Sequence, residues 1–581
     1  MSCANNSSPF VDNCSFIYNT GTSDGGGIHC SFFSNAAVTN CTFELNSATN
    51  DGGGIFCNSS SPSITNCRFT INVSTDGGGI YCYNNSDPSI TNCTLEENIA
   101  VKLGGGVYCN SSTPSITGCT FDNNLAVDAG GGIYCTSSSP PITGCTFGNN
   151  TGYFLGGGGV YCTYSSSPSI MFCTFGNNTT DGYGGGVSCF FDSNPLIIYC
   201  TFETNIAAYA GGGISCFSSG PDIADCFIKN NTTPNSGGGI YCIISNASII
   251  DCTIDNNSSV DGGGVYFYLS SSDSDIADCI LINNTASSNG GGIYCIGANT
   301  SITYCTIESN TATNDGGGVF CNSSNPTIAD CTFDNNTSGN WGGGICGWTS
   351  DSSITGCEFK YNTALYGGGV ACNLISNPPI TNCTFDNNTA INLGGGLICY
   401  GGCNPPISNC EFRNNLSNDR GGGLYCSQSS SPPITNCTIA NNRAVNNGGG
   451  IYCYLTGSLS MFNTIIWNNT AGLAGNQAYI DDLFDSITLH YCCYDDGAGH
   501  FAGAGTLDYT DNCITSDPLF VNAAAGNYRL QSGSPCIDAG NNQYAIDAAI
   551  SEDLDGLLRF FDGAAPFDGA KVDIGAYEYR P

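Results

Sequence analysis

A glycine triplet that recurs along most of the chain constrains the fold more than any other sequence feature. Gly-Gly-Gly triplets begin 25 to 28 residues apart, the first at Gly25 and the last at Gly448. Helical repeats are excluded because the repeats are rich in Gly, Ser, Thr, Asn and Pro, and poor in strong helix formers. A period of 20 to 50 residues is typical of a solenoid, in which each repeat packs mainly against its neighbours.

Each repeat contains two short apolar runs that are bounded by turn residues. After Gly52 these runs are 55–57 and 64–69, and a Ser/Pro-rich turn separates them. Runs of this length with near-alternating polarity predict short β-strands. We therefore predict an all-β fold, a right-handed parallel β-helix solenoid of about 18 coils with 25–28 residues each and an irregular C-terminal cap. The side chains expected to point inward in this repeat are Ile55, Cys57, Ile64, Cys67 and Phe69.

An Asn follows the second Cys of the repeat by five residues in every coil, although the spacing of the triplets varies. A position that never moves relative to a strand is expected at a fixed corner, where Asn tolerates unusual backbone angles. Its side-chain amide can also hydrogen-bond the same amide one coil away. We predict a structural Asn ladder that includes Asn46, Asn72, Asn98, Asn124, Asn150, Asn178 and Asn205.

The 39 cysteines fall mostly in pairs ten or eleven residues apart within one coil. Zinc is disfavoured because the C-x-x-C spacing is absent. Two arrangements remain open: disulfides that staple each coil, or buried thiols that act as small hydrophobes in two ladders. Heavy use of Cys favours an oxidising, extracellular setting. The disulfide candidates are Cys30, Cys41, Cys57, Cys67, Cys82, Cys93, Cys109, Cys119, Cys135 and Cys145.

Two further patterns lie on side chains that are expected to face outward. An aromatic residue follows most triplets, as at Tyr81, Tyr108, Tyr134 and Tyr161, and this row either stacks to stiffen the sheet or forms a platform for sugars or a protein partner. Asn-x-Ser/Thr sequons are frequent in a chain this rich in Asn, Ser and Thr, so chance explains many of them. The candidates for glycosylation are Asn58, Asn110, Asn149, Asn177, Asn230 and Asn322.

The repeat resembles two families of bacterial surface proteins. Gly-Gly-aliphatic triplets followed by Phe-x-x-Asn, as at Phe43–Asn46, are similar to the polymorphic outer-membrane protein repeats. The motifs 517–520, 533–540 and 573–578 resemble the C-terminal region of choice-of-anchor β-helix proteins, which in that family closes the solenoid. We therefore expect a repeat domain at 1–470 and a β-rich capping region at 471–581.

The composition excludes some functions. The chain has 11 Lys+Arg against 47 Asp+Glu and a net charge of −36, so nucleic-acid binding is disfavoured. The chain has no run of about 18 apolar residues, so no transmembrane segment is predicted. The sequence starts partway through a coil without a signal peptide, which indicates either a missing N-terminus or an edge that stacks head-to-tail on another subunit.

Acidic residues near the C-terminus raise the possibility of a structural calcium site. Asp553, Asp555 and Asp573 are the candidate ligands, with Asp562, Asp568 and Glu578 close in sequence. Hard cations such as Ca²⁺ take several carboxylate and carbonyl oxygens. The twelve-residue calcium loop is incomplete here, and no other cofactor is expected.

Catalysis is not expected from the sequence. Pectate lyase chemistry requires clustered cationic residues, whereas Lys102, Lys229, Lys360, Arg68, Arg413, Arg420 and Arg443 are scattered along the repeats. The polygalacturonase route needs clustered Asp with His and Arg. A site around Asp481, Asp482, His490 and His500 stays open. The leading hypothesis is an extracellular or cell-surface structural protein: an adhesin stalk, a surface component or a filament subunit that binds itself or cell-surface glycans and proteins. The alternative is a carbohydrate-active enzyme or sugar-binding module.

Overall fold

The structure is a computed structural model that describes residues 1–270, 274–560 and 571–580. It confirms the predicted fold: an all-β parallel solenoid of about 19 coils, against about 18 expected, with an irregular C-terminal end. The chain forms two compact units, Met1–Ala286 and Ser287–Pro581, which are described separately.

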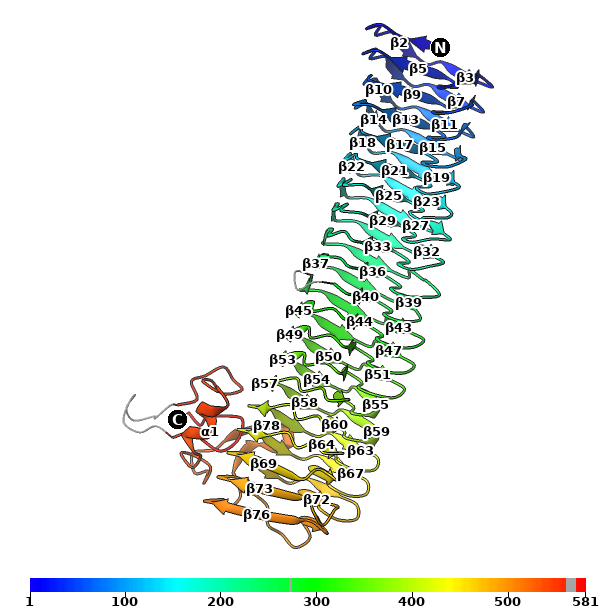
Figure 1. The fold of residues 1–581 in the computed structure, drawn as a ribbon. Helices are drawn as coiled ribbons and strands as arrows, with labels where there is room; N and C mark the ends of the chain where they lie inside the picture. The colour runs from blue at the N-terminus through cyan, green and yellow to red at the C-terminus, as the bar shows by residue number, and fades with distance from the viewer. Residues whose placement is uncertain (271–273, 561–570, 581) are drawn as a thin grey trace. The chain divides into compact units, whose positions relative to one another are not determined.

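One coil of the first unit shows how the repeat folds (Figure 1). The Gly triplet leads into a strand of sheet A, and strands of sheets B, C and D follow at successive corners. The four strands of this coil are β17 (Val107–Asn110), β18 (Ser115–Thr117), β19 (Thr120–Asp122) and β20 (Leu125–Ala126). In the described part of the first unit, sheets A, B and C contain eleven strands each.

Successive coils stack in parallel register, so that equivalent residues lie beside one another. Strand β17 pairs with β21 (Ile133–Thr136), which places Tyr108 beside Tyr134 and Cys109 beside Cys135. Each residue type therefore forms a row along the sheet, and a one-residue slip would turn all side chains to the wrong face.

The interior of the first unit consists of these rows. The inward side chains predicted from the repeat are confirmed, because Ile55, Cys57, Ile64, Cys67 and Phe69 are at most 2% exposed. The Phe rings of sheet C stack face to face, and the ring centroids of Phe121 and Phe147 are 4.7 Å apart. Phe267, which replaces a Cys, is fully buried. The site therefore accepts a large apolar side chain.

The second unit repeats the same plan and continues beyond residue 470. Its sheet B includes β61 (Ile407–Ser408), β65 (Ile434–Thr435), β69 (Ser458–Phe462), β73 (Ser486–His490) and β76 (Thr506–Asp511). Its sheet C includes β62 (Glu411–Arg413), β66 (Thr438–Ala440), β70 (Ile465–Trp467) and β74 (Cys493–Tyr494). The division of the chain at residue 470 stays a prediction.

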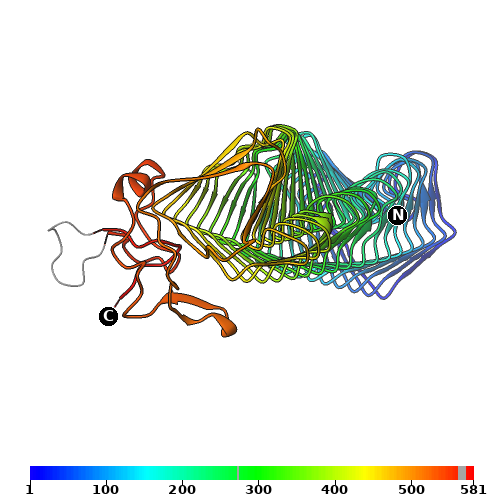
Figure 2. The ribbon, with the colours of Figure 1, turned by 90° about the horizontal axis from the view of Figure 1, so that it is seen from below.

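The C-terminal segment, from Asn512 onward, packs against the flank of the coils in the second unit (Figures 1 and 2). The backbone N–H of Ala576 donates to Thr438 Oγ1 at 3.1 Å, and that of Asn541 donates to Asn463 Oδ1 at 2.8 Å. Asn463 and its corner equivalent Asn436 are fully buried in this region. The segment's regular elements are β77 (Phe520–Asn522), a 3₁₀ turn (Ala523–Ala525), β78 (Asn527–Leu530) and α1 (Asn542–Asp547).

Candidate functional site

The predicted Asn ladder forms a continuous row of buried amide hydrogen bonds. Asn124 is representative: its Nδ2 donates to Asn150 Oδ1 at 2.9 Å and to the Leu95 carbonyl at 2.8 Å. Its Oδ1 accepts from Asn98 Nδ2 at 3.0 Å and from the Asn98 backbone N–H at 3.1 Å. The seven predicted ladder residues are all fully buried. Each amide thus joins its coil to both neighbours and satisfies backbone groups at the corner.

The backbone reason predicted for Asn at this corner is wrong. Left-handed angles occur at the residue before the ladder Asn, such as Leu45 with φ of 53° and Asn123 with φ of 52°. The ladder residues themselves have no positive φ. The invariant Asn is therefore required for its side-chain hydrogen bonds rather than for its backbone tolerance.

The three positions of a triplet require glycine for different structural reasons. Gly52 has φ of +67°, a conformation that L side chains rarely adopt. A Cβ on Gly53 would lie 2.4 Å from the Gly78 carbonyl oxygen of the next coil. A Cβ on Gly54 would meet both the Gly79 carbonyl oxygen at 2.6 Å and the Phe69 ring at 2.8 Å. Backbone conformation thus favours glycine at the first position, and close packing excludes a side chain at the second and third.

The cysteines are free thiols in this structure, so the predicted within-coil disulfides are not formed. The ten candidates, from Cys30 to Cys145, are all buried. The two cysteines of a coil belong to different ladders: Cys109 is the register partner of Cys135 in sheet A, whereas Cys119 lies outside the strands, at the corner between sheets B and C. There the Cys119 backbone N–H donates to Cys145 Sγ at 3.4 Å. The thiol hydrogen bond with Cys145 and burial together raise the pKa of Cys119 to about 12.

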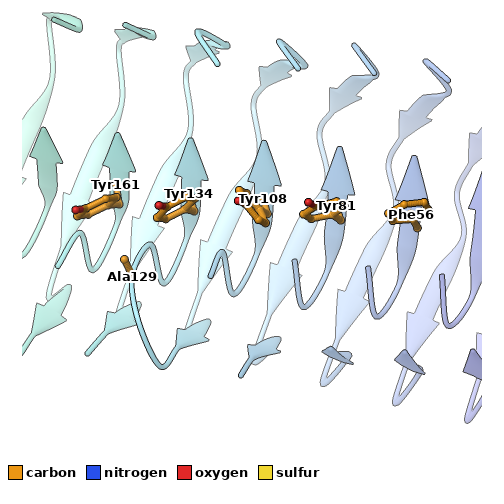
Figure 3. Packing of buried hydrophobic residues seen from close by; sticks show 6 residues of the cluster. All are labelled: Phe56, Tyr81, Tyr108, Ala129, Tyr134 and Tyr161. Atoms are coloured by element: carbon orange, nitrogen blue, oxygen red, sulfur yellow. The ribbon is translucent and has the colours of Figure 1, made fainter. Parts of the chain in front are cut away.

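The aromatic row on sheet A stacks, but it is not an exposed face. Tyr81, Tyr108, Tyr134 and Tyr161 are only 4–6% exposed and form a buried cluster with Phe56 (Figure 3). Neighbouring ring centroids lie 4.7 to 5.2 Å apart in edge-on and stacked pairs. The platform interpretation is therefore wrong for this row, because flanking side chains such as Leu103 pack over the rings.

The sequon candidates keep accessible side chains. Asn149 and Asn177 are exposed at left-handed corner positions, with φ of 54° and 55°. The remaining four, Asn58, Asn110, Asn230 and Asn322, are half-buried. Glycosylation at these positions stays a prediction.

The acidic residues proposed for calcium have other partners in the structure. Asp553 Oδ1 accepts from the backbone N–H groups of Asp555 and Leu557, and Asp573 accepts from those of Asp538 and Tyr579. Asp555 forms an ion pair with Arg529. These oxygens thus have partners within the protein, and a calcium site at Asp553, Asp555 and Asp573 stays a prediction. Asp562 and Asp568 lie outside the described residues.

The cation of this cluster is a buried arginine that the sequence did not single out. The Arg559 guanidinium is fully buried, and its Nη1 lies 3.2 Å from Glu578 Oε1. Burial raises the pKa of Asp573 to about 6 and that of Glu578 to about 9. The one sequence signal for this arrangement is that Arg559 is the single basic residue in an acidic stretch that includes Asp553 and Asp555. The cluster holds the C-terminal segment together.

The four residues considered for catalysis, Asp481, Asp482, His490 and His500, each contact a different partner. Asp481 Oδ2 accepts from the Tyr452 hydroxyl at 2.7 Å, and Asp482 Oδ1 accepts from the Phe484 backbone N–H. His500 Nδ1 lies 3.0 Å from Asp495, and His490 Nδ1 lies 3.0 Å from Asp511.

Five of the cationic side chains of the repeats pair with nearby acids. The ion pairs are Arg68–Glu96, Lys229–Glu203, Lys360–Glu358, Arg413–Asp386, Arg413–Glu411 and Arg420–Asp419. Cationic subsites for an acidic polymer would require several such side chains facing one groove.

A groove between helix α1 and sheet B of the second unit is a candidate binding site. Its cavity measures about 320 Å³, and Phe462 and Tyr544 line it with ring centroids 4.5 Å apart. His490 stacks on Phe462 with ring centroids 5.0 Å apart. The polar groups in the lining include Asp547, Ser408 and Thr435, and Gln543 Nε2 donates to Asp547 Oδ1 at 2.7 Å. Aromatic walls with a carboxylate beside them suit a ligand that has both apolar faces and hydroxyl groups.

Comparison with protein families identifies the fold family. The model described as the right-handed β-helix region matches residues 2–152, 105–281, 274–416 and 368–543. The chain belongs to the right-handed β-helix family. The comparison with curated proteins found no match. In this β-helix protein, the family match covers the repeats and most of the groove residues.

Sequence reasoning missed the groove of this β-helix protein. Tyr544 and Phe462 are 82 positions apart, and no local motif links them. Among the described residues, no three His, Cys, Asp or Glu side chains are grouped to hold a metal ion. No helix in the described ranges is long and apolar enough to cross a membrane.

Proposed function

We propose that this protein is an extracellular or cell-surface structural protein that serves as a stalk, a surface component or a filament subunit. The observation that carries the proposal is the Asn ladder, in which each amide joins two neighbouring coils through buried hydrogen bonds. Buried networks in which all members are satisfied rigidify a structure. The resemblance of the repeats and C-terminal motifs to bacterial surface proteins supports the same function.

Exposed aromatic pairs at the corners of the first unit suit an adhesive role. Tyr164 and Phe191 are 62% and 48% exposed, with ring centroids 5.8 Å apart. Phe172 and Tyr199 form a second exposed pair at another corner, 5.1 Å apart. Solvent-facing aromatic rings are common at protein and glycan contacts because they bury a large area without a large loss of side-chain entropy.

Electron microscopy of the native material tests the structural role. Negative-stain images of the protein isolated from its source should show rods or fibres, with antibody label at the cell surface or in the medium. Label confined to the cytoplasm would contradict the proposal. A chain that cleaves acidic or neutral polysaccharides, detected as new reducing ends or unsaturated products, would also contradict it.

A sugar-binding role is the second candidate, and the groove beside α1 favours it. Phe462 and Tyr544 offer aromatic faces to a sugar ring, while Asp547 and Ser408 offer hydrogen-bond partners for its hydroxyl groups. Isothermal titration against a panel of neutral and acidic oligosaccharides tests this role. Tyr544→Ala should abolish binding, whereas Tyr509→Ala, an exposed aromatic outside the groove, should retain it. Equal binding by both variants would exclude the groove.

A further inference from the structure

One pair of thiols in the second unit lies outside the ladders of the repeat. Cys493 is the first residue of β74 on a coil, and Cys536 lies in the C-terminal segment, 43 positions later. Both side chains are fully buried and belong to one apolar cluster with Ile465, Leu530 and Ile574. Cys536 is also the side chain that most strongly affects the ionisation of the Cys493 thiol, so the two thiols are neighbours within this cluster. A coil and the segment packed on its flank thus meet at two adjacent sulfur atoms.

This pair differs from the ladder cysteines in its geometry. Ladder partners in sheet A are in-register residues on neighbouring parallel strands, such as Cys109 and Cys135. Their Cβ atoms point the same way at a strand spacing of about 4.7–4.9 Å, whereas a disulfide needs Cβ atoms about 3.5–4.5 Å apart. Cys493 and Cys536 come from a strand and a loop, so strand spacing does not separate their sulfur atoms.

The ladder thiols also have a regular set of hydrogen bonds that oxidation would break. Cys119 donates to the Thr117 carbonyl at 3.4 Å, and its sulfur accepts from the Cys93 backbone N–H at 3.4 Å. The Cys493 thiol donates to one backbone group of the described residues, the Ser516 carbonyl at 3.4 Å. Oxidation of this pair therefore costs the fold fewer contacts.

We propose that Cys493 and Cys536 are a disulfide-forming pair that fastens the C-terminal segment to the coils. The oxidant is a small-molecule disulfide such as oxidised glutathione. The thiolate of one cysteine attacks this disulfide, forms a mixed disulfide and releases one glutathione thiolate. The thiolate of the second cysteine then displaces the other glutathione. Two cysteine thiols are oxidised, one disulfide is reduced to two thiols, and the two cysteine protons pass to the departing thiolates.

Burial determines when this reaction occurs. Attack requires a thiolate, and the neighbouring Cys536 thiol together with burial holds the pKa of Cys493 well above its usual range. Both sulfur atoms are also closed to a solvent-borne oxidant while the segment is docked. Oxidation should therefore be fast while the chain folds in a glutathione redox buffer and slow after the segment has docked.

Peptide mapping of the full-length chain tests the proposal directly. The reduced, unfolded chain is refolded with oxidised and reduced glutathione, alkylated, unfolded again and digested with trypsin without reduction. Cleavage after Arg529 and Arg559 gives a peptide whose one cysteine is Cys536. We expect this peptide to be linked to peptide 444–529, with fragment ions that place the bond at Cys493. Recovery of the Cys536 peptide in alkylated form, or a bond to another cysteine, overturns the proposal.

Two variants and a stability measurement complete the test. Cys492→Ser is the matched control, because Cys492 is equally buried but donates to the Met461 and His490 carbonyls instead. The link should persist in Cys492→Ser and disappear in Cys493→Ser. In the wild type, oxidation should slow proteolytic release of the C-terminal segment at least tenfold, and reductant should reverse this protection. Equal release rates for the oxidised and reduced protein would refute the fastening role, and folding of each variant is checked by circular dichroism.

Discussion

Replacing one ladder residue, Asn124→Ala, should destabilise the β-helix far more than a substitution at the adjacent Asn123. The Asn124 side chain makes four buried hydrogen bonds, two to Asn98, one to Asn150 and one to the Leu95 carbonyl. Alanine leaves the Asn98 backbone N–H and one Asn98 amide hydrogen without an acceptor. The Leu95 carbonyl also loses a donor, whereas Asn150 Oδ1 keeps the residue 124 backbone N–H at 3.1 Å.

The magnitude follows from these unpaired groups. A buried donor or acceptor left without a partner costs about 1–3 kcal/mol. Two donors and one acceptor at the lower end of that range amount to about 3–4 kcal/mol of lost unfolding free energy. Asn123→Gly should cost less than about 0.5 kcal/mol, because glycine suits the left-handed backbone at φ of 52° and the exposed Asn123 amide donates only to the half-buried Asp122 carboxylate.

Urea unfolding followed by far-ultraviolet circular dichroism measures both variants. Hydrogen exchange should show loss of protection in the coils that contain Asn98 and Asn150, because solenoid repeats depend on their nearest neighbours. An Asn124→Ala variant within about 1 kcal/mol of Asn123→Gly would refute the reasoning that buried amide hydrogen bonds set the stability of the corner.

Three further predictions concern packing and charge. Gly54→Ala should abolish soluble expression, because its Cβ would meet backbone and ring atoms within 2.8 Å, whereas Gly144→Ala, with nothing within 4 Å, should cost only about 1–2 kcal/mol of backbone strain. Docking of the C-terminal segment should weaken as the pH rises through about 6. Burial raises the pKa of Asp573 in the folded state to about 6, above its unfolded value of about 3.9. The stability that comes from the protonated Asp573 is therefore complete below about pH 4 and is lost above about pH 6. Proteolytic release of the segment between pH 4 and 7 checks this sign, and a rate that falls with pH would contradict it. Arg559→Met should destabilise docking by about 1–3 kcal/mol, because it leaves the buried Gly575 carbonyl without the guanidinium that donates to it, and thermal unfolding of the second unit measures the loss.

The repeat made the fold predictable. A glycine triplet, two apolar runs and an Asn at a constant offset indicate parallel coils, because any other register would place Cys57 or Phe69 in water. The same periodicity identified the Asn ladder residue by residue. It could not predict whether the two cysteines of a coil face each other, since that depends on the corner between the strands of sheets A and B. The burial of Tyr81 was also beyond it, because residues outside the strands such as Leu103 pack against the aromatic cluster.

The sequence by itself therefore determined the features that repeat: the coil length, the inward rows and the ladder, because each depends on interactions between equivalent positions of neighbouring coils. Only the tertiary structure decided the features that occur once. The groove between Phe462 and Tyr544, the burial of Arg559 among carboxylates and the meeting of Cys493 with Cys536 all depend on where the C-terminal segment packs on the coils. These contacts join residues far apart in a non-repeating part of the chain, where periodicity carries no information about spatial proximity.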